Sequence, residues 1–139
     1  ELSVEHFDLI ISNPPYFLNS LQSPSKKQNL AKHHIFSDYS IYLKAINSHL
    51  NLNGVALIIL PIDAVQIFIT NAENIGLNVQ KKMLISPTPQ KPINRVILGL
   101  YKNTSIEPSS PLSLIIQNSG KRNDWTAGYI DLLESFRNY

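Results

Sequence analysis

The sequence predicts an α/β fold built on a mainly parallel sheet. Residues 55–60 form an uninterrupted aliphatic run that stops at Pro61, which is typical of a parallel strand covered on both faces. Apolar residues recur at helical spacing before this run, near residues 38–51, and again after it, over residues 62–75. Strands and helices therefore alternate, which indicates a layered domain with helices on both faces of the sheet and an antiparallel final strand pair.

The amino-terminal part of the chain predicts one strand and one helix joined by a long loop. The strand covers residues 7–12, and residues 18–34 are polar enough to form the loop. Loops of that length in a compact domain are usually functional or disordered. The helix near residues 38–51 has Ser37 and Asp38 as N-cap candidates and is expected to end at Asn53-Gly54. Its apolar positions are Tyr39, Tyr42, Leu43, Ile46 and Leu50.

The carboxyl-terminal part predicts a second helix, three more strands and a last helix. The second helix, over Ile62–Ile75, is expected to end at Gly76. Strands follow over residues 77–85 and 95–102, and the connection between them is too short for a crossover helix, so this pair should be antiparallel. A strand over residues 112–117 and a helix from about residue 126 to residue 137 complete the chain.

The composition indicates one globular domain with a single core. The chain has 139 residues, of which 43% are hydrophobic and 16% charged. The absence of cysteine excludes disulfides, thiolate zinc sites and cysteine nucleophiles. No apolar run approaches the roughly 20 residues that cross a bilayer, and a cytoplasmic location is expected. The net charge is only +2, so any affinity for nucleic acid has to come from local clusters of basic residues.

The stretch that points to chemistry is Asn13-Pro14-Pro15-Tyr16, which follows the first predicted strand directly. Ligands of open parallel sheets bind at the carboxyl ends of the strands. Two prolines fix φ and supply no N–H, so the loop is rigid and offers acceptors. The Asn13 side-chain oxygen and the Pro14 carbonyl can accept hydrogen bonds from one NH2 group, which favours a tetrahedral nitrogen with an exposed lone pair. Tyr16 and Phe17 offer rings on which a flat base or amide can stack.

This tetrapeptide resembles the motif of class I S-adenosylmethionine-dependent amino methyltransferases, which modify exocyclic amines of nucleobases or a glutamine side-chain amide. Within that group the chain most resembles the bacterial family that methylates N6 of an adenine in valine tRNA. The resemblance includes Ser12 and Phe17 around the motif, the Ala31-Lys32-His33-His34 step, and Arg95-Val96-Ile97-Leu98. It continues through the tail, at Leu114, Tyr129, Leu132, Leu133 and Phe136.

The resemblance implies a transfer of a methyl group from S-adenosylmethionine to an adenine N6 of tRNA. Asn13 and Pro14 would orient the amine beside the cofactor, and Pro15 would stiffen the loop. Tyr16 and Phe17 would hold the base. Phosphates of the RNA would meet a basic loop that contains Lys26, Lys27, Lys32 and His33. Lys32 stands where relatives often have arginine, which keeps the charge but loses bidentate geometry.

The same resemblance covers only about half of the family's chain. The family's Gly-rich cofactor loop has no counterpart, since the five glycines are isolated from one another. We expect residues 1–139 to be the second half of a methyltransferase domain that is inactive alone, with residues 104–139 as a strand-and-helix extension. The first strand would then lack its neighbour and leave an apolar edge. Self-association, or binding to the missing half of the domain, is the expected result.

Other interpretations of the same residues remain open. The Asn-Pro-Pro-Tyr stretch can be a plain strand terminator or a Pro-rich ligand segment. The activity can instead be methylation of a glutamine N5 in a release factor, or the chain can be a nucleic-acid-binding module without catalysis. The basic loop can simply be solvated, as Lys81-Lys82 and Lys121-Arg122 are expected to be.

Three further side-chain groups have weaker indications. His33 and His34 are adjacent and lack the spacing of metal ligands, so no metal site is expected. Arg95 can pair with a phosphate or with a carboxylate, either Asp63 or Glu73. Tyr39 and Tyr42 are expected to pack at the edge of the core rather than to stack on bases.

Overall fold

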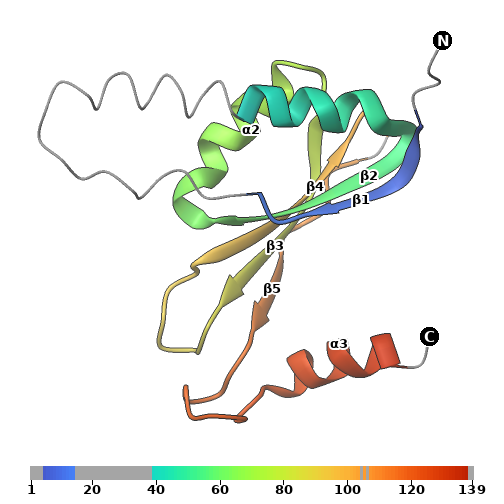
Figure 1. Cartoon of the computed structure of the whole chain (residues 1–139). Coiled ribbons are helices and arrows are strands. Elements are labelled where there is room, and N and C mark those ends of the chain that lie inside the picture. The colour runs from blue at the N-terminus through green and yellow to red at the C-terminus, as the bar shows by residue number, and fades with distance from the viewer. Residues whose placement is uncertain (1–4, 15–38, 104, 106, 138–139) are drawn as a thin grey trace, which may run out of the picture.

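The computed structural model describes residues 5–14, 39–103, 105 and 107–137, and these form an α/β domain on a five-stranded sheet (Figure 1). The strands lie in the order β1-β2-β4-β3-β5 across the sheet. Their bounds are Phe7–Ser12 for β1, Leu50–Pro61 for β2, Asn78–Ser86 for β3, Arg95–Tyr101 for β4 and Leu112–Ile115 for β5.

Strand β4 is the antiparallel member of the described sheet. It pairs antiparallel with β2 on one side and with β3 on the other, whereas β1 pairs parallel with β2 and β5 parallel with β3. The other four described strands therefore run in one direction, and their carboxyl ends meet at one edge of the sheet. The mixed α/β class and the antiparallel pairing of the strands before and after residues 86–92 are both confirmed.

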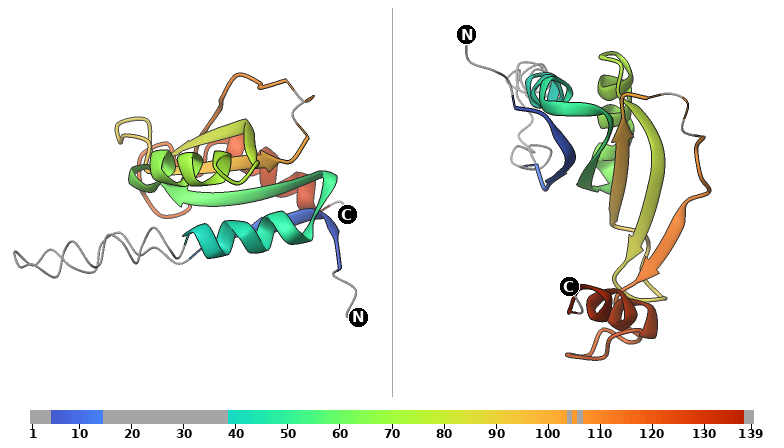
Figure 2. Two further views of the ribbon diagram at one scale, coloured as in Figure 1. Left: turned by 90° about the horizontal axis from the view of Figure 1, so that it is seen from above. Right: turned by 90° about the vertical axis from the view of Figure 1, so that its right-hand side faces the viewer.

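Three helical segments in the described part of the chain connect or follow the strands. The first is helical over residues 39–49, between β1 and β2. The second begins as a 3-10 turn, η1 (Ile62–Ala64), and continues as α2 (Val65–Glu73). Gly76 ends it as predicted, because its φ of 82° is a left-handed conformation that lets Leu77 N–H donate to the Ala72 carbonyl at 3.0 Å. Helix α3 (Ala127–Arg137) lies beyond β5, apart from the other two (Figures 1 and 2).

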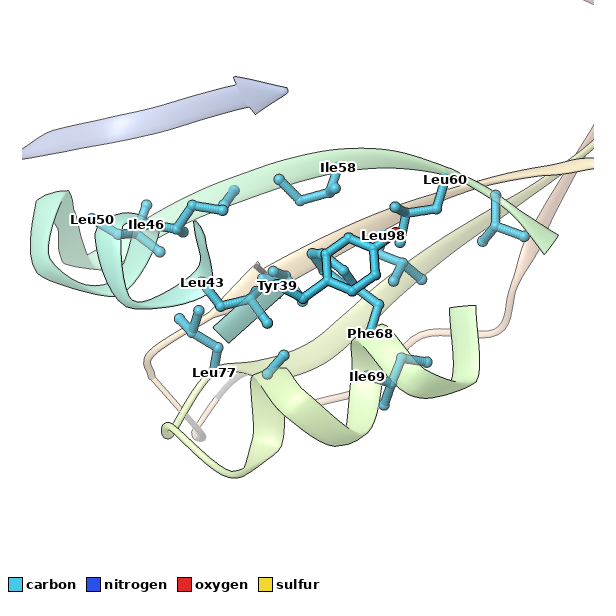
Figure 3. Close-up of a cluster of buried hydrophobic side chains, with 14 residues drawn as sticks. Tyr39, Leu43, Ile46, Leu50, Ile58, Leu60, Phe68, Ile69, Leu77 and Leu98 are labelled. Carbon is cyan, nitrogen blue, oxygen red and sulfur yellow. The ribbon is translucent and has the colours of Figure 1, made fainter. Parts of the chain in front are cut away.

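The two crossover helices cover the same face of the sheet. Tyr39 from the first helix meets Phe68 of α2 edge to face, with ring centroids 5.2 Å apart (Figure 3). Both connections join parallel strands and move across the sheet in the same direction, and right-handed crossovers then place both helices on one side. Beneath them lie Ala56, Ile58 and Leu60 of β2 and Val96, Leu98 and Leu100 of β4, all buried.

The opposite face of the sheet carries no helix among the described residues, which differs from the expected cover on both faces. Leu57 and Ile97 lie on this face and are only partly buried. Leu9 and Ile11 of β1 are 52% and 72% exposed. We call this surface the helix-free face. Its side chains are apolar because the strands are patterned for burial on both sides.

Gly54 has a different role from the predicted end of a helix. The helix stops at residue 49, and β2 already begins at Leu50, so Gly54 lies inside the strand. The register of β1 and β2 shifts between Phe7 and Leu9, and a Cβ on Gly54 would lie 2.9 Å from the Phe7 carbonyl oxygen. The glycine therefore permits close approach of two backbones at an irregularity in the ladder.

Candidate active site

Asn13 and Pro14 lie at the carboxyl end of β1, where the sequence predicts the site. Ser12 is the last residue of β1 and pairs with Ile58, so the strand ends within the sheet rather than beyond it. Asn13 is exposed and Pro14 is buried. A buried proline after an exposed asparagine anchors the loop while the amide side chain reaches the edge at which the parallel strands end.

Tyr42 of the first helix packs behind this strand end. Its ring lies 6.2 Å from the ring of Phe68, centroid to centroid. Burial raises the pKa of the Tyr42 phenol above its usual value of 10.0, and the neighbouring Ser12 hydroxyl offsets part of that rise. The Tyr42 hydroxyl is buried and has no partner with hydrogen-bond geometry among the described residues, so burial dominates the shift. Tyr42 packs at the edge of the core as expected, whereas Tyr39 lies inside the core and is 1% exposed.

Arg95 lies at the same edge of the sheet as Asn13. It begins the antiparallel strand β4 and pairs in register with Pro61 at the end of β2 and with Ile85 near the end of β3. Its Nη1 donates to the Asn94 carbonyl at 2.9 Å, and the same carbonyl accepts from Ile62 N–H at 3.2 Å. The guanidinium is therefore held by local backbone at the start of β4, while the predicted choice between a phosphate and Asp63 or Glu73 is untested.

Most of the predicted substrate contacts fall outside the described residues. These are Pro15, Tyr16, Phe17, Lys26, Lys27, Lys32 and His33, together with His34 and the cap candidates Ser37 and Asp38. Of the predicted catalytic residues, the structure places Asn13 and Pro14. Among the described residues, no three histidine, aspartate or glutamate side chains are grouped closely enough to hold a metal ion.

Two apolar cavities lie along the described sheet, and neither is lined by Asn13. The larger, about 380 Å³, lies between the first helix and the outer side of β1, with Phe7, Tyr42 and His49 in its wall. The smaller, about 200 Å³, lies on the helix-free face between Leu57, Met83 and Leu112. Both are lined mainly by apolar side chains, and Lys81 and Lys82 also line the smaller one.

Sequence reasoning missed an aromatic pair at the carboxyl end of β5. Trp125 and Tyr129 have ring centroids 5.3 Å apart at an interplanar angle of 47°. They flank the start of α3 and follow Lys121 and Arg122, which the sequence had indicated only as solvated charge. The available signal was the chain's single tryptophan beside two basic residues in a turn-rich stretch.

Searches of known proteins connect the chain to tRNA methyltransferases. No family model matches it. It is 28% identical over 136 residues to the tRNA1(Val) (adenine(37)-N6)-methyltransferase of Trichodesmium erythraeum, which covers 98% of this chain and 55% of that protein. It is 32% identical over 130 residues to the protein of the same name from Phocaeicola vulgatus, covering 94% of this chain and 54% of that protein. The chain thus spans about half the length of these relatives.

A solved structure supports the fold. A predicted O-methyltransferase from Agrobacterium tumefaciens superimposes with a TM-score of 0.60 at 19% identity, over 94% of this chain and 52% of that one. At this identity the likeness concerns the fold alone. The matched share of that protein agrees with the matched share of the sequence relatives, because this chain again covers about half of the larger protein.

Proposed function

We infer from these homologues that the chain belongs with the tRNA1(Val) (adenine(37)-N6)-methyltransferases, and we propose that it forms the amine-holding half of such an enzyme. In this proposal residues 1–139 are the second half of the methyltransferase domain. Residues 104–139 are an extension that adds β5 to the sheet beside β3 and ends in α3.

The observation that carries the proposal is the position of Asn13-Pro14 at the carboxyl end of a parallel strand. An adenine N6 is planar and a poor nucleophile until its lone pair is released from the ring. Two acceptors fixed on one loop, the Asn13 side-chain oxygen and the Pro14 carbonyl, would hold both hydrogens of the NH2 group and stabilise the pyramidal form in the transition state. Pro15 would restrict the loop further, and Tyr16 and Phe17 would stack on the base.

S-adenosylmethionine would supply the methyl group. Of the residues at this strand end that the structure describes, Asn13 is exposed and can face a ligand, and Pro14 is buried. In our proposal Asn13 touches one side of the bound cofactor. The remaining contacts come from the part of the relatives' length that this chain does not match.

The RNA is proposed to contact the basic loop after the motif. Lys26, Lys27, Lys32 and His33 stay predictions, since the structure does not describe them. Their charge would bind phosphates, and substitution of Lys26 and Lys27 by alanine would flatten the salt dependence of RNA binding.

We also propose that the helix-free face is covered in the working enzyme by the segment that this chain does not match. Strands added on the outer side of β1 would extend the sheet away from β2, opposite to the direction in which the crossovers of this chain move. Right-handed crossovers would then place their helices on the opposite face, the one carrying Leu9, Ile11 and Leu57. The chain alone would use the same edge and face to self-associate.

The test is methyl transfer by a chimera in which the first half of the Phocaeicola vulgatus relative precedes this chain. With labelled S-adenosylmethionine and a valine-tRNA transcript, the chimera should label the tRNA. Asn13→Ala should lower turnover about 100-fold to 1000-fold, the usual cost of removing one preorganised acceptor or donor, while cofactor affinity stays within about threefold.

The matched control is Asn74→Ala, an exposed asparagine that follows α2. It should leave turnover unchanged. Full turnover of Asn13→Ala would refute the assigned role. Labelling of a release-factor protein instead of the tRNA would move the substrate to a glutamine amide and keep the amine-holding role of Asn13.

A further inference from the structure

The loops that follow β3 and β5 are fastened to each other. Ile116 N–H donates to the Ser86 carbonyl at 3.1 Å, and Gln117 N–H donates to the Pro87 carbonyl at 2.9 Å. Figure 1 shows both loops together below the sheet, beyond the strand ends that they follow. Two backbone hydrogen bonds therefore join the start of the loop after β5 to the start of the loop after β3, at the carboxyl edge of the sheet.

The second of these loops is also closed on itself. Gln117 and Trp125 form an antiparallel bridge, and Asn118 N–H donates to the Asp124 carbonyl at 2.9 Å. The Asn118 side chain donates to the Asp124 carboxylate at 3.1 Å and to the Trp125 carbonyl at 3.0 Å. Two residues between them, Gly120 and Asn123, have positive φ of 78° and 63° and make the chain turn tightly.

Asp124 is the acidic residue of this turn, and its charge is used within the loop. The Ser119 hydroxyl and the Asn118 amide both donate to the carboxylate. These hydrogen bonds, the first from Ser119, lower the pKa of Asp124 below its usual 3.8, with a smaller contribution from nearby Lys121. The carboxylate thus fixes the loop, while Lys121 and Arg122 stay exposed.

An exposed aromatic side chain follows these cations in the same turn. Trp125 is 36% exposed although it packs against Tyr129. Lys91 on the partner loop is exposed as well. The acids of α3, Asp131 and Glu134, come after the aromatic pair along the helix. A hydrogen-bonded loop that carries both exposed cations and an accessible indole is a combination that binds single-stranded nucleic acid, because bases stack on the ring and phosphates meet the cations.

We propose that Lys91, Lys121, Arg122 and Trp125, which we call the Trp125 surface, bind unpaired nucleotides of the RNA several positions away from the target base, because β5 and β1 lie at opposite ends of the strand order. Trp125 stacks on a base, and the three cations contact phosphates. This inference rests on the proposed function for the identity of the RNA, and it adds a second contact region at the same edge of the sheet as Asn13. Two contact regions would fix the register of the RNA strand, which one amine-holding loop does not do.

The first test uses the fluorescence of Trp125, the only tryptophan of the 139-residue chain. The chain is titrated with a 12-nucleotide oligoadenylate and with a valine-tRNA transcript. Stacking should quench the emission, and the titration should saturate. An unchanged emission at RNA concentrations that bind the chain by anisotropy would overturn the proposal.

The second test uses variants, with labelled oligoadenylate followed by anisotropy. Trp125→Ala should weaken binding about fivefold to 150-fold, whereas Trp125→Phe, which keeps a stacking ring, should recover most of the loss. Lys121→Ala with Arg122→Ala should reduce the slope of log K against log salt by about 1.4, which is about 0.7 for each phosphate contact on a single strand. The control is Lys44→Ala, an exposed lysine on the first helix, which should change neither quantity.

The outcomes separate this inference from the proposed function. Methyl transfer by the chimera without quenching, or equal effects of Lys44→Ala and of Lys121→Ala with Arg122→Ala, would reject the Trp125 surface and leave the enzyme assignment in place. Quenching and the expected variant effects without methyl transfer would support the surface and remove the enzyme assignment. Because Trp125→Phe preserves the packing against Tyr129, a loss of binding that phenylalanine does not restore would count against stacking.

Discussion

The two faces of the sheet are built from the same strands and are covered differently. On one face Ile58 is fully buried beneath the first helix and α2. On the other face its neighbour Ile59 is only partly buried, and Ile11 of β1 is 72% exposed. Both sides of β2 are equally aliphatic, so the composition of the strand does not decide which side is covered.

The difference shows that the face covered by helices depends on how the strands are connected rather than on the composition of the strands. The first helix and α2 each lie between two parallel strands, and both crossovers move across the sheet in the same direction. The handedness of such crossovers then fixes one face for both helices. One complete core is enclosed within about half the length of the relatives, and the other face is left with apolar side chains that need a different partner.

The largest expected effect is on the covered face. Ile58→Ala should lower the free energy of unfolding by about 2 to 5 kcal/mol, because the deletion leaves a cavity among buried side chains that cannot collapse fully. Ile59→Ala removes the same atoms one residue further on, on the helix-free face, and should cost less than about 1.5 kcal/mol. Urea unfolding followed by circular dichroism measures both.

These two variants form a matched pair, since they share the residue type, the strand and the substitution. Equal losses for Ile58→Ala and Ile59→Ala would mean that the helix-free face is covered in solution, for instance by a second copy of the chain. Repeating the measurement over a range of protein concentrations would then separate a dimer from a monomer.

The strands and the end of α2 could be predicted because their signals are local. An aliphatic run before Pro61 and a glycine after a helical pattern depend on a few neighbouring residues, and both were confirmed. Gly54 was misjudged because its reason lies in β1, more than 40 residues earlier, where the Phe7 carbonyl approaches it. The helix cover on one face only, as seen among the described residues, was not predicted because it requires strand order and handedness together.

The same distinction between local and distant signals applies to the candidate site. Asn13-Pro14 could be placed at a strand end from a contiguous motif. The Trp125 surface could not, since it depends on hydrogen bonds from Ile116 and Gln117 to a loop about 30 residues earlier in the chain. In sequence alone, Lys121 and Arg122 are indistinguishable from solvated charge.

A smaller effect is expected where β1 joins the sheet. Gly54→Ala would place a Cβ 2.9 Å from the Phe7 carbonyl oxygen and 3.0 Å from that of Asp8, and both are backbone atoms that cannot rotate away. We expect a loss of about 1 to 3 kcal/mol. Hydrogen exchange should increase at the amides of β1, which carries Asn13, more than in β3 and β4.

The control for this variant is Gly128→Ala in α3, where a Cβ would meet nothing within 4 Å. That change should be neutral or slightly stabilising, because alanine is the better helix former. If Gly54→Ala were as harmless as Gly128→Ala, β1 would be held loosely enough to shift, and the strand that carries the motif would depend on a partner for its position.

The smallest effect on stability, and the most direct probe of the uncovered side, is expected for Ile11→Lys. Ile11 is exposed on the helix-free face, so the substitution should change the free energy of unfolding by less than about 0.5 kcal/mol. It should nevertheless reduce self-association, since a lysine on an apolar edge strand opposes pairing with another chain. Light scattering across a concentration series should show a lower average mass than for the unchanged chain.

Ile41→Lys is the control, because Ile41 is similarly exposed, at 67%, but lies on the first helix. A monodisperse monomer before any substitution would remove the case for association, and an equal response to Ile41→Lys would mean that charge in general, rather than this face, governs it.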